Sequence, residues 1–230
     1  MTFPIIAIDG PSASGKGSIA RGLARELGFA HLETGLLYRF IGKQWLFARK
    51  DINDLAIAER IAQKFASHFT MDLIDDSSLR TNPVAEAASI TSAHPPVRAA
   101  LLELQRNFAA HPPKDAKGAI LDGRDIATIV CPDAPVKIFV TASLEIRAER
   151  RRKELQGRGD IVTPDQVLQE VRARDLRDTT RDTAPLMAAA GSFTLDTSNL
   201  NPAEAIEKAL EIVRQAIPTW RESKKLFDNE

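Results

Sequence analysis

The chain of 230 residues is predicted to fold as an α/β domain, with a five-stranded parallel sheet flanked by helices on both faces. Two observations predict this class. Short apolar runs alternate with helical patterns, and a glycine-rich loop stands between the first apolar run and the first helical pattern. The expected strands are 3–9, 29–32, 119–122, 136–141 and 193–196. Several end in a polar residue at the carboxyl edge, where open α/β sheets bind ligands: Asp9, Asp122, Thr141 and Asp196.

Helix ends are predicted from capping residues. A helix over 16–27 stops before Gly28, which suits the left-handed conformation after a helix, and a second helix runs from about 35 to 49. The run 163–166, Thr-Pro-Asp-Gln, combines an N-cap, an N1 proline and a capping-box glutamine, and it opens a helix from 164 to about 179. The pair 201–202, Asn-Pro, starts the last helix, which Pro218 ends.

Composition excludes several classes of protein. The formal net charge is zero, which argues against a nucleic-acid-binding protein. Cys131 is the single cysteine, so no disulfide framework and no thiolate metal site is expected. No signal peptide and no apolar stretch near the ~20 residues that span a membrane is present, so we expect a cytoplasmic protein with no membrane partner. A monomer is expected because no exposed apolar stripe is evident.

The glycine-rich loop has the pattern of a P-loop, in which backbone N–H groups and a helix N-terminus bind phosphate. A lysine in this loop places its charge on the β- and γ-phosphates, so ATP is the expected ligand. Directly after the lysine stands a glycine and then Ser18, a spacing typical of kinases that act on nucleotides; we expect Ser18 to face Mg²⁺. The predicted ATP-binding loop is Gly10, Pro11, Ser12, Ala13, Ser14, Gly15, Lys16, Gly17 and Ser18.

Arginines recur at helical spacing near the end of the 164–179 helix. Arg174, Arg177, Asp178 and Arg181 stand at i, i+3, i+4 and i+7 and share one face of a helix. A solvated face with local acidic partners is the plain alternative. Three arginines on one stripe repel one another unless an anion lies between them, so beside a P-loop they favour a phosphate-binding role.

Two further segments point to the same edge of the sheet. The run 122–125, Asp-Gly-Arg-Asp, follows the third expected strand, and Asp122 is suited to hold Mg²⁺ through water. The run 34–39 opens a helix after the second strand, so its N-terminus can receive an acceptor phosphate that Arg39 pairs.

Two regions interrupt the alternation of strands and helices. Residues 39–94 hold helical segments and a possible short strand from Thr70 to Ile74, and they are expected as an insert over the acceptor site. Residues 153–163 are expected as a mobile connection within a lid over about 153–181. The core of this single kinase domain is then about 1–38, 95–152 and 182–217, followed by a polar tail, 218–230, whose Trp220 and Phe227 have an open role.

These residues together resemble the bacterial cytidylate kinase (CMP kinase) family of nucleoside monophosphate kinases. The resemblance runs from residue 4 to about 215. It is carried by the P-loop, by Leu-Glu-Thr-Gly at 32–35 with Tyr-Arg at 38–39, by Asp-Gly-Arg-Asp at 122–125, and by further motifs at 132–139, 147–151, 174–186 and 195–198.

The resemblance implies an adenylate-kinase-like fold and transfer of the ATP γ-phosphoryl group to CMP or dCMP, with Mg²⁺. It implies that Thr34, Tyr38, Arg39, Arg124, Arg174 and Asp178 bind the acceptor's phosphate and sugar. It further implies that Ser89, Arg98 and Asp125 read the cytosine. Lys16 and Arg181 would bridge the transferring phosphates, with Arg124 and Arg174 sharing the catalytic role. Arg147 and Arg151 would contact ATP from the lid side.

The chain departs from the family pattern at two places. Ala127 stands where the family usually has glycine, and the segment before Arg80 is shorter than usual, so part of a β-hairpin in the acceptor insert is expected to be missing.

Three other readings stay open at this point. One is a kinase of the same fold that acts on AMP or UMP. Another is a nucleotide-binding regulatory protein without catalysis. A GTPase is disfavoured because no Asn-Lys-x-Asp motif is present. The choice between CMP and dCMP stays open as well.

Overall fold

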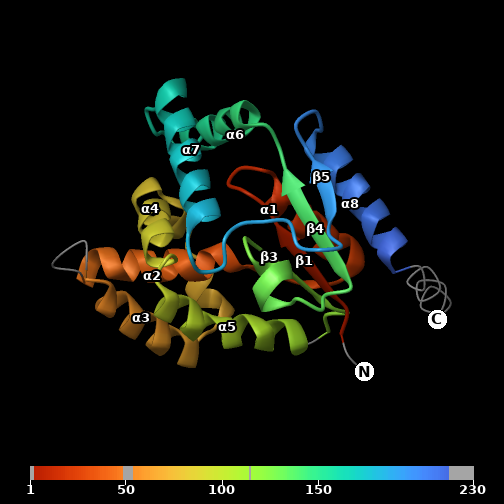
Figure 1. Ribbon diagram of the computed structural model, residues 1–230, viewed down its shortest axis with the longest axis horizontal. Helices are drawn as coiled ribbons and strands as arrows, with labels where there is room; N and C mark the ends of the chain where they lie inside the picture. The colour runs from red at the N-terminus through yellow and green to blue at the C-terminus, as the bar shows by residue number, and fades with distance from the viewer. Residues whose placement is uncertain (1–2, 49–53, 114, 218–230) are drawn as a thin grey trace.

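The computed structural model describes residues 3–48, 54–113 and 115–217 (Figure 1). As predicted, its five strands form one parallel sheet; their order in the sheet is β2-β3-β1-β4-β5. In chain order the strands are β1 Ile5–Asp9, β2 Ala30–Glu33, β3 Ala119–Gly123, β4 Val136–Thr141 and β5 Phe193–Asp196.

β1 occupies the centre of the sheet because its apolar side chains are buried on both faces. Ile6, Ala7 and Ile8 have no exposed surface, and β3 and β4 pair with β1 on either side. Since all strands run in the same direction, their carboxyl ends meet at one edge. The register there sets Asp9 beside Gly123 and Phe139, which brings the predicted polar strand ends together.

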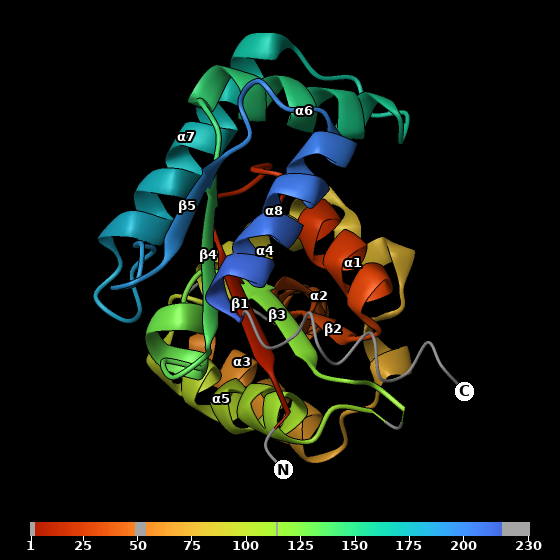
Figure 2. The same cartoon turned by 90° about the vertical axis from the view of Figure 1, so that its right-hand side faces the viewer.

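Helices cover both faces of the sheet. α1 Lys16–Leu27 and α8 Pro202–Ala216 pack side by side on one face, as Figure 2 shows, around the even-numbered side chains of β1. On the other face, α2 Thr34–Ala48, α3 Leu55–Ser67 and α5 Pro95–Ala110 enclose a second core with the fully buried Trp45.

The remaining helices stand over the carboxyl edge of the sheet. α4 Asn82–Thr91 packs on α2, and α6 Leu144–Gln156 pairs with α7 Pro164–Thr180 (Figure 1). The α6–α7 pair has a small apolar cluster of its own: Ala148, Leu155, Val167 and Val171. The pair is therefore a separate packing unit that reaches the sheet through polar contacts, described below.

The predicted helix caps at Gly28, Thr163 and Asn201 are confirmed, whereas Pro218, predicted to end the last helix, lies outside the described residues. Gly28 has φ 67° and its N–H donates to the carbonyl of Ala24. Both hydrogen bonds of the capping box are formed at Thr163, and both are formed again at Asn201.

Two predictions need correction. The possible strand from Thr70 to Ile74 is wrong: Met71–Ile74 is a 3₁₀ turn, η1, followed by a second one, η2 Ser77–Arg80. A lone apolar run without a partner strand gains no ladder hydrogen bonds, and Asp76 instead caps η2 through Ser78 N–H at 2.8 Å. No strand occurs in the described part of 39–94, in line with the expected loss of the hairpin. The connection expected over 153–163 starts later, because α6 continues to Gln156.

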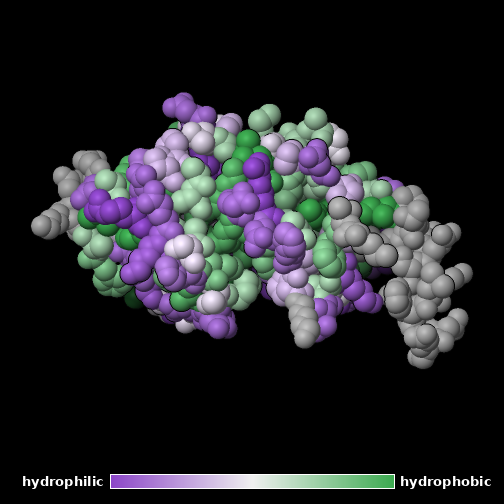
Figure 3. All heavy atoms as spheres, turned by 90° about the horizontal axis from the view of Figure 1, so that it is seen from below, coloured by the Kyte–Doolittle hydropathy of each residue, from purple (hydrophilic) through white to green (hydrophobic). Residues whose placement is uncertain are grey.

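The outer surface is mixed in character. The face shown in Figure 3 carries hydrophilic and hydrophobic side chains interspersed over its width. Among the described residues, no helix has both the length and the apolar character that a membrane crossing requires. The expected contacts of Trp220 and Phe227 in the tail lie outside the described residues.

The close packing of α2 on α4 generates a prediction. A Cβ added at Gly42 would lie 2.6 Å from the backbone nitrogen of Ala88, so α4 would have to move. We expect Gly42→Ala to lower the free energy of unfolding by about 1–3 kcal/mol in urea denaturation. Gly35→Ala, in the same helix but with no atom within 4 Å of the added Cβ, should leave stability unchanged or slightly raised. Equal effects of the two substitutions would contradict this packing account.

Candidate active site

The P-loop connects β1 to α1 at the carboxyl edge of the sheet. A Cβ at Gly10 would lie 2.0 Å from the carbonyl oxygen of Val140, and Gly15 has φ 91°, so both positions require glycine. Thr197 Oγ1 donates to the carbonyl of Ser14 at 2.8 Å and fastens the loop to the end of β5. The Ser14 hydroxyl is buried and has no partner within the described residues, so it is free to bind a ligand.

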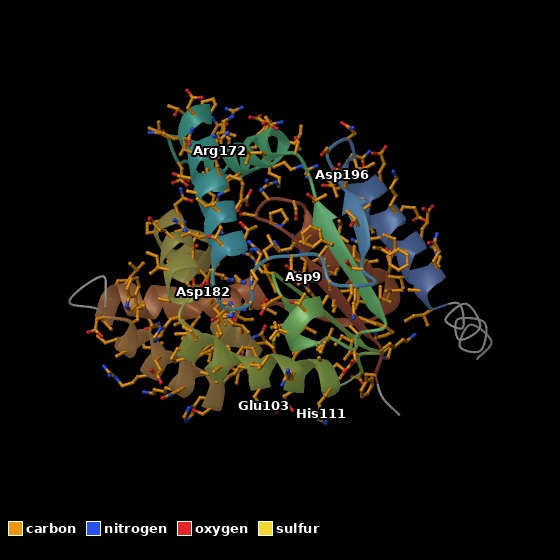
Figure 4. The ribbon with its side chains drawn as sticks, in the orientation of Figure 1. Asp9, Glu103, His111, Arg172, Asp182 and Asp196 are labelled. Atoms are coloured by element: carbon orange, nitrogen blue, oxygen red, sulfur yellow. The ribbon has the colours of Figure 1, made fainter. Side chains whose placement is uncertain are left out.

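Asp9, at the carboxyl end of β1, supports the segment that follows β3. Its two carboxylate oxygens accept hydrogen bonds from the backbone N–H groups of Ile126 and Ala127, both at 2.8 Å. These bonds hold a π-helical turn, η3 Ile126–Val130, directly after Asp125. Burial raises the pKa of Asp9 to about 6, although the two N–H groups favour the ionised form. Figure 4 shows Asp9 in the middle of the molecule, where it fixes the backbone that carries Asp125. Ala127 is accommodated in this turn, 4% exposed.

One cavity brings together nearly all of the predicted acceptor residues. Of the predicted set, Arg39 alone does not line it; its Nη1 donates to the carbonyl of Leu79 at 2.8 Å. The cavity is lined by Thr34, Gly35, Tyr38, Ala88, Ser89, Ser92, Arg98, Gly123, Arg124, Asp125, Arg174, Asp178 and Arg181. Strand ends, the N-terminus of α2, α4, α5 and α7 all contribute to this list.

A buried ion pair lines this cavity. Arg98 Nη2 donates to Asp125 Oδ2, and both side chains are about 8% exposed. Arg98 also donates to the carbonyl of Ser92 at 3.1 Å and lies over the ring of Tyr38, 5.4 Å from its centroid. One oxygen of Asp125 and the Ser89 hydroxyl therefore remain available for a ligand.

Several arginines with few acidic partners line the same cavity. Arg124 Nε donates to Asp178 Oδ2 at 2.8 Å, and despite burial the charges of Arg124 and Arg174 lower the pKa of Asp178. Arg174 Nη1 reaches Ser12 Oγ at 3.4 Å. Arg174 Nε and Arg181 Nη2 are buried without a partner in the described residues. Donors without acceptors in a buried site are those that an anion would satisfy.

The positive charges near the P-loop oppose one another. Burial, together with the charges of Arg124 and Arg174, lowers the pKa of Lys16 to about 7. Burial and the same Arg124 charge lower the pKa of Arg174 to about 9. The only acceptor recorded for Lys16 Nζ within the described residues is the carbonyl of Pro11 at 3.3 Å. The site thus holds more positive charge than its own carboxylates neutralise.

A second cavity of about 430 Å³ adjoins the first one and shares Arg174 with it. Ser12 of the P-loop, Arg151 of α6, and Asn82 of α4 also line it. Arg151 Nη2 donates to Asn82 Oδ1, so this predicted ATP ligand contacts the insert in the structure. The charge of Arg151, after burial, lowers the pKa of Arg39 to about 10.

Arg147 links the P-loop to α7. Its Nη1 lies 3.4 Å from the carbonyl oxygen of Ser12 and 2.7 Å from Asp175 Oδ2. Asp175, which could have been an acidic partner for the arginines of its own helix, therefore pairs with Arg147 of α6 instead. Arg181 stands at the C-cap of α7, and its Nε donates to the carbonyl of Ala184 at 2.8 Å.

The two predicted Mg²⁺ ligands differ in exposure. Asp122 is buried, and although burial opposes its ionisation, a 2.7 Å hydrogen bond from His31 Nε2 and the charge of Lys16 lower the pKa of its carboxyl. Ser18 lies exposed in the first turn of α1, where Arg21 Nη2 approaches its hydroxyl at 3.5 Å. No group of three His, Cys, Asp or Glu within the described residues could cage a metal. An ionised carboxylate and a hydroxyl that do not enclose the ion suit Mg²⁺ that is bound together with phosphates.

Several residues of the site were not predicted. His31, the partner of Asp122, showed no metal-ligand spacing in the sequence. Arg150 donates to Thr197 Oγ1 at 2.9 Å and so supports the P-loop from α6. Arg80 forms a two-pronged pair with Glu33, at 3.0 and 2.7 Å. Each pair joins residues at least 47 positions apart, and no local pattern signals such contacts.

The electrostatics of Lys16 predict a pH-dependent gain in stability when its charge is removed. The folded pKa is about 7 against 10.5 for a free lysine, so between these values the unfolded chain binds more protons. The penalty on folding is complete below pH 7 and fades as pH rises. We expect ligand-free Lys16→Met to melt at a higher temperature than the unsubstituted protein at pH 6.5, with a smaller difference at pH 9. Lys153→Met, at an exposed lysine of α6, is the control. A difference that does not shrink with pH would contradict the account.

Comparison with known proteins agrees with this geometry. The family model described as cytidylate kinase matches residues 6–215. A cytidylate kinase of Rhodospirillum rubrum is 50% identical over 209 residues, covering 91% of this chain and 96% of the relative. One of Paramagnetospirillum magneticum is 52% identical over 209 residues, covering 91% and 97%. An uncharacterized protein of Eubacterium ventriosum, with a solved structure, is 13% identical and covers 90% of this chain and 96% of its own, with a TM-score of 0.50; it shares the fold alone. On the family match and these identities, the chain belongs to the cytidylate kinase family.

Proposed function

We propose that the chain moves the γ-phosphoryl group of ATP to CMP or dCMP, giving ADP and CDP or dCDP, at the carboxyl edge of the sheet. Membership of the cytidylate kinase family carries the reaction. The observation that assigns roles within the site is a single cavity lined both by the buried Arg98–Asp125 pair and by the cations Arg124, Arg174 and Arg181. A nucleoside monophosphate offers a base to the former and a phosphate to the latter.

On the donor side, the P-loop would hold ATP. Its backbone N–H groups and the positive end of α1 face the phosphates, and the Lys16 ammonium adds charge on the β- and γ-phosphates. The unpartnered Ser14 hydroxyl supports this role. Arg147 and Arg151, which approach the loop and the neighbouring cavity from α6, would contact ATP from the other side.

On the acceptor side, Arg39, Arg124 and Arg174 would bind the phosphate, with Thr34 and Tyr38 lining the same cavity, and Asp178 would accept a hydrogen bond from the sugar. Arg98, Asp125 and Ser89 would read the base. Cytosine presents an amino donor at N4 and Asp125 has a free carboxylate oxygen, whereas uracil presents a carbonyl at the same position. Two acceptors facing each other in a buried site disfavour UMP.

The chemistry requires charge compensation more than proton transfer. The second pKa of a phosphate monoester is near 6, so the acceptor is already largely a dianion at neutral pH. No general base is then needed, and the difficulty is that two anions must meet in line. Lys16, Arg174 and Arg181 would face the negative charge that develops, and the unsatisfied donors of Arg174 and Arg181 would need no reorganisation to bind it.

Mg²⁺ would be held on this chain by Ser18 and, through water, by Asp122. When bound, the ion would neutralise part of the negative charge of the phosphates. The lowered pKa of Asp122 supports this assignment because a metal ligand must be ionised. His31 would orient the carboxylate through its 2.7 Å hydrogen bond.

Water competes with the acceptor, so the site must close during turnover. We assign this role to the insert, residues 39–94, and to the lid, about 153–181, over the core formed by 1–38, 95–152 and 182–217. Polar contacts such as that of Arg177 with Ser89 support an arrangement in which the two approach each other over the edge of the sheet. The monomeric state and the cytoplasmic location stay predictions from the sequence.

The direct test is ADP formation from Mg-ATP with CMP, dCMP, UMP or AMP, and with no acceptor. We expect turnover with CMP and dCMP far above that with UMP and AMP. Preference for another acceptor would overturn the base-reading roles, and ATP binding without any acceptor-dependent turnover would favour a regulatory protein.

Arg181 is predicted to act on the reacting phosphates. Arg181→Ala removes a buried, unpartnered guanidinium nitrogen at the cavity, and we expect kcat to fall by at least about 100-fold, since an arginine that stabilises this transition state contributes ~10³–10⁵ in rate. Arg172→Ala removes an exposed arginine of the same helix, at its outer side in Figure 4, and should leave kcat unchanged. Near-normal turnover in Arg181→Ala, with the protein folded, would remove this role.

Asp125 is predicted to select the base. Asp125→Asn keeps the shape of the side chain but replaces a carboxylate oxygen by an amide, which can donate to the uracil carbonyl. We expect the ratio of kcat/KM for CMP over UMP to fall by about 10-fold or more. Asp133→Asn, at an exposed position nearby in the chain, should leave the ratio as it is. An unchanged ratio in Asp125→Asn would show that another residue reads the base.

A further inference from the structure

Three arginines of the α6–α7 unit reach across to the insert. Arg158 donates to the backbone carbonyl of Arg80, Arg151 donates to Asn82, and Arg177 Nε donates to Ser89 Oγ at 3.1 Å. α7 stands beside α4 in Figure 1, which is where the third contact is made. Of the three contacted residues, Ser89 alone lines the acceptor cavity.

The hydrogen bond from Arg177 restricts what the Ser89 hydroxyl can do. A guanidinium has no acceptor, so Ser89 Oγ must accept this bond and its own proton is left for another partner. Thr91, on the same helix, donates its hydroxyl to the carbonyl of Ala87 at 2.9 Å. Ser89 Oγ has no such acceptor within the described residues, and its side chain is buried, 7% exposed. Its proton is therefore available to the cavity.

Arg177 does not line the acceptor cavity itself. It lines the neighbouring cavity with Ser12 and Asn82, and it is an exposed residue. The other members of its stripe have different partners: Arg174 reaches Ser12, and Asp178 pairs with Arg124. Arg177 therefore approaches Ser89 from outside the cavity, in a place from which it can orient the hydroxyl without touching the acceptor.

We propose that Arg177 is a positioning residue that makes Ser89 a hydrogen-bond donor toward a carbonyl or hydroxyl oxygen of the pyrimidine nucleotide. This assignment rests on the proposed function, since it names how that site binds its acceptor. Because Arg177 belongs to α7, the donor is oriented when the α6–α7 unit lies against the insert. Recognition of the acceptor is thereby coupled to the position of the lid.

A double-mutant cycle on CMP binding tests the coupling. The dissociation constant for CMP is measured by calorimetry for the unsubstituted protein, Ser89→Ala, Arg177→Ala and the double variant. Loss of one such hydrogen bond raises the constant by about 10-fold. If Arg177 acts through Ser89, each single variant shows this rise and the double variant shows it once, at about 10-fold rather than about 100-fold. The kcat at saturating CMP should change much less than KM.

Two further variants separate orientation from charge. Arg177→Lys keeps the charge but loses the Nε donor, and it should bind CMP as weakly as Arg177→Ala. Arg158→Ala removes a contact of the same kind to a residue outside the acceptor cavity, so any effect it has should multiply with that of Ser89→Ala. Thermal unfolding of each variant checks that all are folded; Arg177 and Arg158 are largely surface residues, whose replacement is well tolerated.

The outcomes that overturn the proposal are distinct from failure of the proposed function. Multiplying effects of Ser89→Ala and Arg177→Ala, recovery in Arg177→Lys, or normal CMP binding in Arg177→Ala would each show that Arg177 does not orient Ser89. If the unsubstituted protein prefers another nucleotide over CMP in the turnover assay, the proposed function itself is wrong, and this assignment is wrong with it.

Discussion

Repulsion among half-buried cations at the carboxyl ends of β1 and β3 is the constraint that shapes this molecule. Burial and the Arg124 charge lower the pKa of both Lys16 and Arg174, and the few carboxylates nearby leave donors on Arg174 and Arg181 unsatisfied. Such an arrangement opposes folding in the absence of ligand. It is maintained by a rigid surround: a five-stranded sheet, two capped helices and an α6–α7 unit with its own apolar core. In the proposed function, phosphates would supply the missing negative charge, so this repulsion would favour nucleotide binding and stabilisation of the transition state.

Polar residues at the strand ends hold in place the residue that is proposed to read the base. Asp9 holds the turn after Asp125 by two backbone hydrogen bonds, and Asp125 is held in turn by Arg98. Asp125, the proposed base-reading residue, is thus supported by β1 and β3, the most buried part of the sheet, whereas Arg174, one of the proposed phosphate ligands, comes from α7. The proposed acceptor site is therefore held partly by the sheet and partly by α7, and Arg177 links α7 to Ser89 of α4.

Local signals made most of the fold predictable. The P-loop, the five strands, and the caps at Gly28, Thr163 and Asn201 depend on residues close in sequence, and the structure has them where predicted. The acceptor cavity was predictable only through the family resemblance, because it gathers residues from 34 to 181. His31 beside Asp122 and Arg80 beside Glu33 could not be foreseen, since a contact between distant segments leaves no periodicity in either. The run from Thr70 to Ile74 misled because an apolar run without a partner strand does not specify a strand.

The pKa of Lys16 tests this account most directly. It can be followed by NMR through the side-chain carbon next to the amine in isotopically labelled protein, with Lys16→Met to assign the signal. The account predicts a pKa of about 7 in the ligand-free protein and a clear rise when ATP binds, because phosphate charge replaces cation repulsion. An ordinary lysine pKa near 10.5 without nucleotide would contradict it, since the positive charges would then not oppose one another.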